Sequence, residues 1–190
     1  MKISKLKIIG GTNKGRVISF NPSKSLRPTS HKTRETLFNW LAIYIDDSKC
    51  LDLFSGTGAL GIEALSRNAK SVTFIENKKL HYIKLKENLD LMSYSKKSKI
   101  IFENTFDWLE KLNKQKLDSD IVFIDPPFGE KKIQKVYGIL EKKSLLKNDT
   151  VIYVEAEKEL NIMDICSNWT ELKTKISGET KFSLFLKKKE

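Results

Sequence analysis

From about residue 49 onwards, short apolar runs alternate with segments whose apolar residues recur every three or four positions. Apolar runs predict buried strands, and the three-to-four spacing predicts helices with one buried face. The predicted strands span residues 50–54, 71–76, 99–103, 120–125 and 150–155. The predicted helices follow them at 59–67, 78–91, about 105–113, about 131–143 and about 157–166. This alternation is typical of a mostly parallel sheet with helices on both faces.

Both ends of the chain carry a different pattern. Residues 3–9 and 15–20 surround the turn-forming sequence GGTNKG, which predicts a hairpin. Residues 169–176 and 180–187 flank SGE and predict a second hairpin, which would add an antiparallel edge to the sheet. The expected fold class is therefore α/β, with a mostly parallel seven-stranded sheet, an antiparallel C-terminal hairpin and a small N-terminal extension.

A further helix is predicted to begin near Thr29 or Ser30, because either side chain can cap it. Its apolar residues follow the i, i+3, i+4, i+7, i+8 pattern of one buried face: Leu37, Trp40, Leu41, Tyr44 and Ile45. On such a helix Arg34 and Glu35 lie off the apolar stripe, close to the first turn.

Length and composition favour one ordinary domain with room for a small appendage. No apolar run approaches the roughly 20 residues of a membrane span, and the N-terminal apolar stretch is too short for a signal peptide. A cytoplasmic protein is therefore expected. Cys50 and Cys166 lie far apart and form no CxxC pair, so we expect reduced, structural thiols.

The positive charge is concentrated at the N-terminus. The net charge is +11, and the first 34 residues carry nine Lys or Arg and no acid. Three of the four arginines fall in this segment: Arg16, Arg27 and Arg34. A guanidinium fork suits phosphate, and a basic segment without acids is typical of a nucleic-acid binder. A merely solvated, lysine-biased tail is the alternative interpretation.

The sequence LDLFSGTGALGIEAL carries the clearest binding motif. Gly56, Gly58 and Gly61 match G-x-G-x-x-G between a predicted strand and a predicted helix. Glycine permits a tight turn and a close approach of a ligand to the backbone. Glu76 ends the next strand, 20 residues after Gly56, where an acid can hold the two hydroxyls of a ribose. A nucleoside ligand is favoured over a turn that needs glycine for geometry alone.

Asp52 favours S-adenosylmethionine over NAD as the ligand. It lies inside the first strand, four residues before Gly56. An acid there can pair with an amino group, which S-adenosylmethionine carries on its methionine end and NAD lacks at that place. Asn104 and Thr105 end the third strand, where polar atoms can meet the adenine. Phe54 borders the glycine loop and is more typical of a core residue than of a ligand contact.

The sequence DPPF follows the fourth strand, so it faces the same crevice as the glycine loop. An exocyclic amine is a poor nucleophile, and an acceptor for its protons helps to localise its lone pair. Asp125 and the carbonyl of Pro126 are candidate acceptors. Pro126 and Pro127 stiffen the backbone, and Phe128 offers a flat face for a flipped-out base, worth roughly 1–3 kcal/mol. Alternatively, the prolines only end the strand and Phe128 packs in the core.

Neither histidine is typical of a metal ligand. His31 and His81 are 50 residues apart, and no acids cluster beside them in the sequence. We therefore expect no metal.

Four segments together resemble the bacterial RsmD family: IIGGTNKGR, LRPTSHKTRETLFNWL, LDLFSGTGALGIEALSRNA and VFIDPPF. The members of that family use S-adenosylmethionine to methylate the N2 amine of a guanine in 16S rRNA. The resemblance covers nearly the whole chain. It implies a class I S-adenosylmethionine-dependent methyltransferase (Rossmann-like) fold over residues 29–190, with a basic, RNA-binding extension over residues 1–28. It also implies guanine 966 of the small-subunit rRNA as the target, within a 30S subunit or an assembly intermediate.

The resemblance also assigns residues. Matched to the family motifs, Asp52, Gly56, Gly58 and Glu76 would bind S-adenosylmethionine, and the four residues of DPPF would hold the guanine. The residues that match the N-terminal motif are Arg27, Thr29, Arg34 and Glu35. Arg16, Arg27, Thr29 and Arg34 are the candidate RNA contacts, and the two arginines of the motif are expected to meet phosphate. Glu35 would orient Arg34 or close over the cofactor.

The chain departs from the family pattern in three places. His31 and Lys32 stand where the family usually has Asp-Arg, and Lys7 stands for an arginine. Asn104 or Thr105 replaces an acid. These changes bear on the RNA and adenine contacts rather than on methyl transfer.

Three other functions remain open from the sequence. The first is methylation of another amine, such as adenine N6 in DNA or a protein amide. The second is an inactive RNA-binding assembly factor, and the third is a dehydrogenase. No membrane partner is expected, and we expect a monomer.

Overall fold

The computed structural model describes residues 3–22, 29–112, 116–127 and 130–188. Its main sheet has seven strands in the spatial order β5-β4-β3-β6-β7-β9-β8. Their bounds are β3 Lys49–Asp52, β4 Ser71–Glu76, β5 Ser98–Phe102, β6 Ile121–Ile124, β7 Val151–Glu157, β8 Trp169–Ser177 and β9 Thr180–Lys187. Strands β3 to β7 pair in parallel, whereas β9 pairs antiparallel with both β7 and β8. The predicted α/β class and its antiparallel C-terminal hairpin are confirmed.

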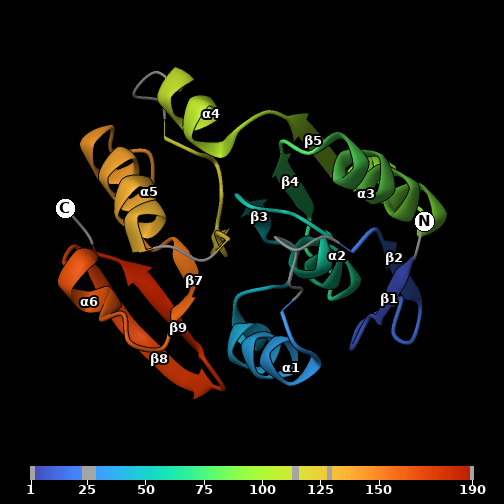
Figure 1. The fold of residues 1–190 in the computed structure, drawn as a ribbon, viewed down its shortest axis with the longest axis horizontal. Helices are drawn as coiled ribbons and strands as arrows, with labels where there is room; N and C mark the ends of the chain where they lie inside the picture. Colours follow the sequence, from blue (N-terminus) through green and yellow to red (C-terminus); the bar gives the residue numbers. More distant parts are fainter. Residues whose placement is uncertain (1–2, 23–28, 113–115, 128–129, 189–190) are drawn as a thin grey trace.

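Helices cover both faces of this sheet (Figure 1). Their bounds are α1 His31–Trp40, α2 Ala59–Ser66, α3 Lys79–Leu91, α4 Thr105–Lys111, α5 Glu130–Lys142 and α6 Ile162–Ile165. Strand β6 shows how the sequence builds two cores. Alternate side chains of a strand point to opposite faces, so Ile121 and Phe123 pack with α1, α2 and α3, while Val122 and Ile124 pack with α4, α5 and α6.

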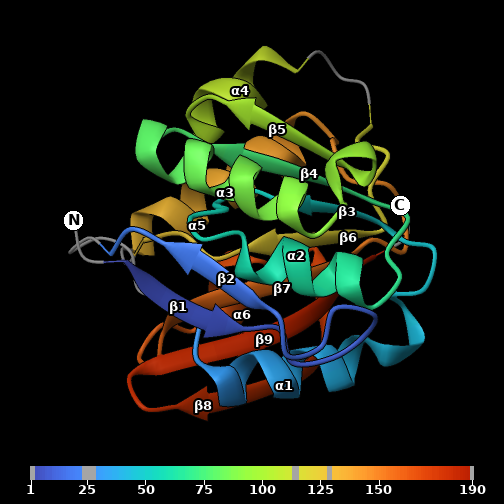
Figure 2. The same ribbon diagram turned by 90° about the vertical axis from the view of Figure 1, so that its right-hand side faces the viewer.

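The N-terminal hairpin is also confirmed, and it is firmly attached. Strands β1 (Ser4–Lys7) and β2 (Val17–Phe20) form a separate antiparallel pair beside α2 and α3 (Figure 2). Ile8 and Ile18 are buried in the core that contains α1, α2 and α3. The Asn88 side chain of α3 exchanges two hydrogen bonds with the backbone of Ser19, at 3.1 and 2.8 Å. The boundary at residue 28 lies outside the described residues and stays a prediction.

Helix α1 begins as its sequence predicts. The Ser30 hydroxyl accepts a hydrogen bond from the Thr33 N–H at 3.1 Å, which satisfies one unpaired N–H of the first turn. Leu37, Leu41 and Ile45 are buried, and Trp40 and Tyr44 are half-buried. After Trp40 the chain continues as a short 3-10 helix, Leu41–Ile43.

The helix predicted over residues 157–166 is much shorter, and this prediction was wrong over its first half. Strand β7 extends to Glu157, because pairing with Thr180 of β9 keeps that end extended. Only Ile162–Ile165 is helical.

Cys50 and Cys166 are buried, free thiols, as expected for structural cysteines. No helix within the described ranges is long and apolar enough to cross a membrane.

Candidate active site

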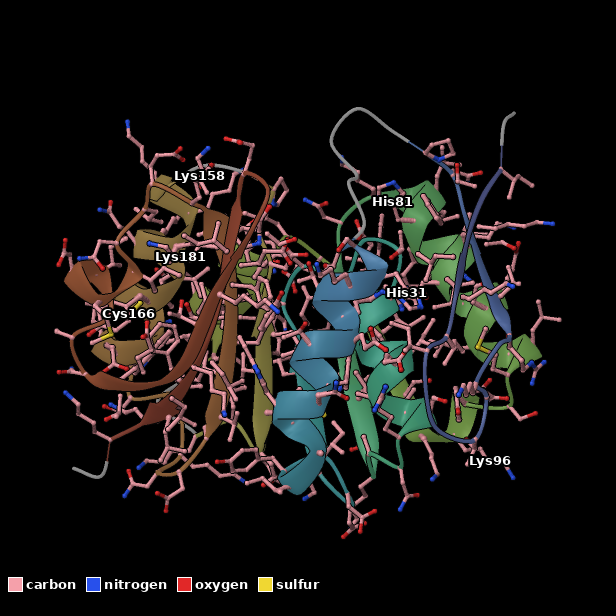
Figure 3. The ribbon with its side chains drawn as sticks, turned by 90° about the horizontal axis from the view of Figure 1, so that it is seen from below. His31, His81, Lys96, Lys158, Cys166 and Lys181 are labelled. Carbon is pink, nitrogen blue, oxygen red and sulfur yellow. The ribbon has the colours of Figure 1, made fainter. Side chains whose placement is uncertain are left out.

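A crevice of about 950 Å³ opens at the carboxyl ends of the parallel strands. Four acids at or near the ends of four strands line it: Asp52 of β3, Glu76 of β4, Asp125 after β6 and Glu155 of β7. Parallel strands end at the same edge of a sheet, which is why residues so far apart in the chain meet here. The start of α1 and the β8–β9 turn complete the wall. Figure 3 shows α1 lying between the β8–β9 hairpin and the N-terminal hairpin, with His81 on α3 behind it.

The glycine loop joins β3 to α2 along one wall of this crevice. Gly56 and Gly58 have φ values of 52° and 77°, in the left-handed region where a side chain would be strained. Gly61 serves a different purpose, because a Cβ there would collide with the Phe74 ring of β4. The glycines therefore shape the turn and let α2 lie directly on the sheet.

Glu76 fixes this loop while it faces the crevice. Its Oε2 accepts a hydrogen bond from the Gly56 N–H at 2.8 Å, and its Oε1 accepts one from the Lys78 N–H at 2.7 Å. The His81 Nδ1 lies 3.7 Å from Oε2. A carboxylate oxygen has more than one acceptor position, so both oxygens can also accept from hydroxyls of a ligand.

Asp52 is 3% exposed, at the end of β3. Burial raises the pKa of its carboxyl to about 7, against the opposing effect of hydrogen bonds from the backbone N–H groups of Gly61 and Phe54. The negative charge of Glu76 raises it further. A ligand ammonium group beside Asp52 would offset the cost of burying this charge.

Asn104 and Thr105, the candidate adenine contacts, line the crevice, but each already forms a side-chain hydrogen bond within the protein. The Asn104 side-chain oxygen caps α4 by accepting from the Phe106 N–H at 2.9 Å. The Thr105 hydroxyl donates to the Leu53 carbonyl. Phe54 also lines the crevice, and its ring meets the Phe106 ring edge-on at 6.0 Å. Phe54 thus belongs to the crevice as well as to the core beside it.

Asp125, Pro126 and Pro127 line the crevice after β6, the strand that pairs with β3. Its Oδ2 accepts a hydrogen bond from the Thr29 hydroxyl at 3.2 Å. Burial raises the pKa of the Asp125 carboxyl well above its usual range, and the nearby charges of Glu155 and Asp52 raise it further. The fourth residue of the corner, Phe128, lies outside the described residues, so its stacking role stays a prediction.

Glu155 is a crevice residue that the sequence analysis missed. Its Oε2 lies 3.2 Å from the Thr29 hydroxyl and accepts a hydrogen bond from the Tyr153 hydroxyl at 2.8 Å. A signal was available, because Glu155 is the acid at the end of the run VIYVE, just as Asp125 ends IVFID and Glu76 ends VTFIE.

Arg34 does not lie on the surface, which corrects the expectation that it meets RNA phosphate. Its side chain is 2% exposed and its Nη1 lies 3.4 Å from Oε2 of the fully buried Glu63. Its Nη2 donates to the Lys7 carbonyl at 3.1 Å and its Nε to the Thr29 carbonyl at 3.4 Å. Glu35 is exposed.

The other candidate RNA contacts lie in three different situations. Thr29 is buried in the crevice wall rather than on an outer surface. Arg16 is exposed, and it donates to the Asn13 side chain at 3.0 Å and to the Leu91 carbonyl at 2.6 Å. Arg27 lies outside the described residues. In the described part of the chain, no group of three or more His, Cys, Asp or Glu is arranged to hold a metal ion.

The fold, a mostly parallel seven-stranded sheet with an antiparallel C-terminal hairpin, is that of class I S-adenosylmethionine-dependent methyltransferases. The family described as Conserved hypothetical protein 95 matches residues 6–186, and the chain belongs to that family. It is 43% identical over 186 residues to Ribosomal RNA small subunit methyltransferase D of Buchnera aphidicola subsp. Acyrthosiphon pisum, covering 97% of this chain and 95% of that protein. The protein of the same name from Escherichia coli K12 is 37% identical over 180 residues, 95% of this chain and 89% of that protein. The predicted family resemblance is confirmed.

Solved structures agree with this assignment. The Escherichia coli protein yhhF is 35% identical and superposes with a TM-score of 0.86, covering 98% of this chain and 100% of that one. An RNA methyltransferase from Salinibacter ruber, solved with S-adenosyl-L-homocysteine, has a TM-score of 0.67 over 86% of this chain and 95% of that one. At 16% identity, the second structure shows the shared fold alone.

Proposed function

We propose that this protein transfers a methyl group from S-adenosylmethionine to the N2 amine of a guanine in 16S rRNA of the small ribosomal subunit. The family resemblance implies guanine 966. One observation carries the proposal: the glycine loop with Asp52 and Glu76 shares a single crevice with the Asp125-Pro126-Pro127 corner. The names of the relatives, which are rRNA methyltransferases, support the same substrate class.

The cofactor wall fits S-adenosylmethionine by size and by donor set. The crevice volume of about 950 Å³ is at the upper end of the roughly 300–1,000 Å³ usual for ligand sites, which leaves room for a cofactor and a base. The buried Asp52 carboxylate would hold the methionine ammonium group, and Glu76 would accept from the ribose hydroxyls. Asn104 and Thr105 would flank the adenine. When bound, the cofactor supplies an electrophilic methyl group on a positively charged sulfur.

Asp125, Pro126 and Pro127, together called the target wall, would hold the target base. Asp125 would accept a hydrogen bond from the N2 amine, and the two prolines give it a stiff backbone. Asp125 and this stiff backbone would hold the amine nitrogen toward the methyl group that the cofactor would supply. The amine then loses one proton to the Asp125 carboxylate. A base inside folded rRNA must first be exposed or flipped out to reach this depth.

The exposed Arg16 guanidinium would meet phosphate on the rRNA, together with the basic N-terminal segment. Because the proposed substrate is ribosomal, we also propose the cytoplasmic localisation that the sequence predicts.

The test is methyl transfer from labelled S-adenosylmethionine to 30S subunits that lack the native modification. The product would be mapped by nuclease digestion and mass spectrometry, with Asp125→Ala as the inactive variant. We expect N2-methylguanine at one rRNA position, lost in the variant. If neither 30S subunits nor naked 16S rRNA accept label while calorimetry shows S-adenosylmethionine binding, the substrate assignment is wrong. If the cofactor does not bind either, the site assignment is wrong as well.

A further inference from the structure

Glu155 and Asp125 are neighbours across two adjacent parallel strands. Ile124 of β6 pairs with Val154 of β7, so the two acids follow each other at the same level of the sheet. Adjacent strands lie about 4.7–4.9 Å apart. Both acids line the crevice, with Glu155 on the side toward the β8–β9 hairpin. The target wall and Glu155 therefore present two carboxyl groups side by side.

The Thr29 hydroxyl bridges these two groups, at 3.2 Å from Asp125 Oδ2 and 3.2 Å from Glu155 Oε2. A hydroxyl has one hydrogen, so it can donate to only one carboxyl at a time. The second contact becomes a hydrogen bond when that carboxyl carries a proton and donates it to the hydroxyl oxygen. The arrangement is thus satisfied with one shared proton, and once that proton is released to solvent the two carboxylates can accept from a ligand with two adjacent donors.

Glu155 is also held in place from a second direction. The hydroxyl of Tyr153, which is fully buried, donates to Glu155 Oε2 at 2.8 Å from the same strand. Two hydroxyls from different elements therefore fix the orientation of this carboxyl group. Such pre-orientation is the condition for a precise contact with a ligand.

Guanine presents two donors side by side on its Watson–Crick edge, the N1–H and the N2 amine, whereas adenine presents an acceptor beside one amine. We propose that Glu155 accepts the N1–H of the target guanine while Asp125 accepts from its N2 amine, which makes Glu155 the residue that selects guanine. This inference rests on the proposed function and names the chemistry by which that site recognises its substrate. An ionised carboxylate only accepts hydrogen bonds, so a base with an acceptor at N1 would face it unfavourably.

The test compares guanine with 2-aminopurine at the methylated position, introduced by ligating a synthetic segment into 16S rRNA before 30S reconstitution. 2-Aminopurine keeps the amine and lacks the N1–H. We expect the wild-type kcat/KM to favour guanine by roughly tenfold to a hundredfold, the range for losing one charge-assisted hydrogen bond. In Glu155→Gln this ratio should fall to within about threefold of unity, because the amide nitrogen can donate to the unprotonated N1.

Glu157→Gln is the matched control, since it removes the same charge two residues along β7 and Glu157 does not line the crevice. It should leave the ratio at the wild-type value. If Glu155→Gln lowers both rates equally and keeps the ratio, Glu155 only supports Asp125 and the inference is wrong. If Glu155→Gln does not fold, Tyr153→Phe gives the same readout: it loosens Glu155 and should lower the ratio, and an unchanged ratio overturns the inference. A wild-type enzyme that leaves the guanine unmethylated overturns the proposed function itself.

Discussion

Two carboxyl groups with little access to water have different surroundings: Glu63 is fully buried, and Asp125 is half-buried in the crevice. Glu63 of α2 is fully buried and meets the guanidinium groups of Arg34 and Arg67, with Nε of the latter at 2.9 Å from Oε1. Asp125 instead meets the Thr29 hydroxyl and the negative charges of Glu155 and Asp52. A buried charge that is paired with cations serves the fold. A buried group whose pKa is raised by like charges in a crevice is typical of a functional site. The two acids therefore differ in role: Glu63 stabilises the fold, whereas Asp125 has the features of a functional residue.

The largest effect is expected from removing the acid of the target wall. Asp125→Ala should reduce single-turnover methyl transfer roughly a hundredfold to a thousandfold, because the amine loses its proton acceptor. The folded state should not be destabilised by loss of this charge. Rapid-quench assays and thermal unfolding at pH 8 measure the two quantities. The exposed Asp47→Asn is the control, and wild-type activity in Asp125→Ala would refute the assignment.

Removing the charge of Glu63 should lower stability and leave the cofactor site intact, which is the reverse of the effect expected for Asp125→Ala. Glu63→Gln leaves two guanidinium groups beside a neutral side chain, which costs about 3 kcal/mol and lowers the Tm by roughly 6–12 °C. S-adenosylmethionine affinity, measured by calorimetry well below the Tm, should stay within about twofold of wild type. The exposed Glu87→Gln should barely change the Tm, since its pair with Lys84 lies at the surface. A Glu63→Gln protein as stable as wild type would mean that Glu63 does not stabilise the fold.

Asp52 links stability to pH. Its folded pKa of about 7 lies above the ordinary value, so the folded state holds a proton that the unfolded state releases. The stability from this group is complete at low pH and is lost as pH rises through about 7. Without cofactor, the free energy of unfolding of Asp52→Asn should therefore rise by about 2 kcal/mol relative to that of wild type when the pH is raised from 5 to 8.5. The variant should also lose S-adenosylmethionine affinity. Thermal scans at both pH values check this, and a pH-independent difference would contradict it.

The raised pKa of Asp125 predicts a pH-dependent rate. Only the ionised carboxyl can accept from the amine, so kcat/KM should fall as pH drops through a pKa well above the usual carboxyl range. Among the described residues, the groups that act on Asp125 include the Thr29 hydroxyl, the charges of Glu155 and Asp52, and the Tyr153 hydroxyl. Glu155→Gln removes a like charge and should shift the profile toward lower pH by about one unit. A profile that stays in place would show that the two acids are not coupled.

The smallest effect concerns the two arginines at the N-terminal end. Arg16→Gln should weaken 30S binding only a few-fold and reduce the slope of log affinity against log salt by about one, as for one lost phosphate contact. Arg34→Lys should leave that slope unchanged and lower the Tm instead, because Arg34 is buried. Fluorescence binding at several salt concentrations distinguishes them. Equal salt slopes for wild type and Arg16→Gln would remove Arg16 from the RNA contacts.

The sequence predicted the mostly parallel sheet and three of the four acids that line the crevice, because both follow local rules. Glu76 and Asp125 each end an apolar run, Asp52 lies within one, and parallel strands end together. Arg34 was misplaced because a charged residue off an apolar stripe is usually exposed. Its partner Glu63 lies 29 residues away on another helix, and only the folded chain brings the two together. Glu155 also follows an apolar run, VIYV, although β7 continues for two residues beyond it.

The position of Glu63 also limits how the protein can be shortened. Its two oxygens accept the backbone N–H groups of Ile9 and Gly10, at 2.9 and 2.8 Å. The N-terminal hairpin thus supplies two of the hydrogen-bond donors that compensate for burying the charge of Glu63. A chain trimmed to begin at residue 29 would lose these donors together with the apolar cover of Ile8 and Ile18. The N-terminal arm is therefore a part of the enzyme's interior, and it cannot be removed as a detachable RNA-binding module.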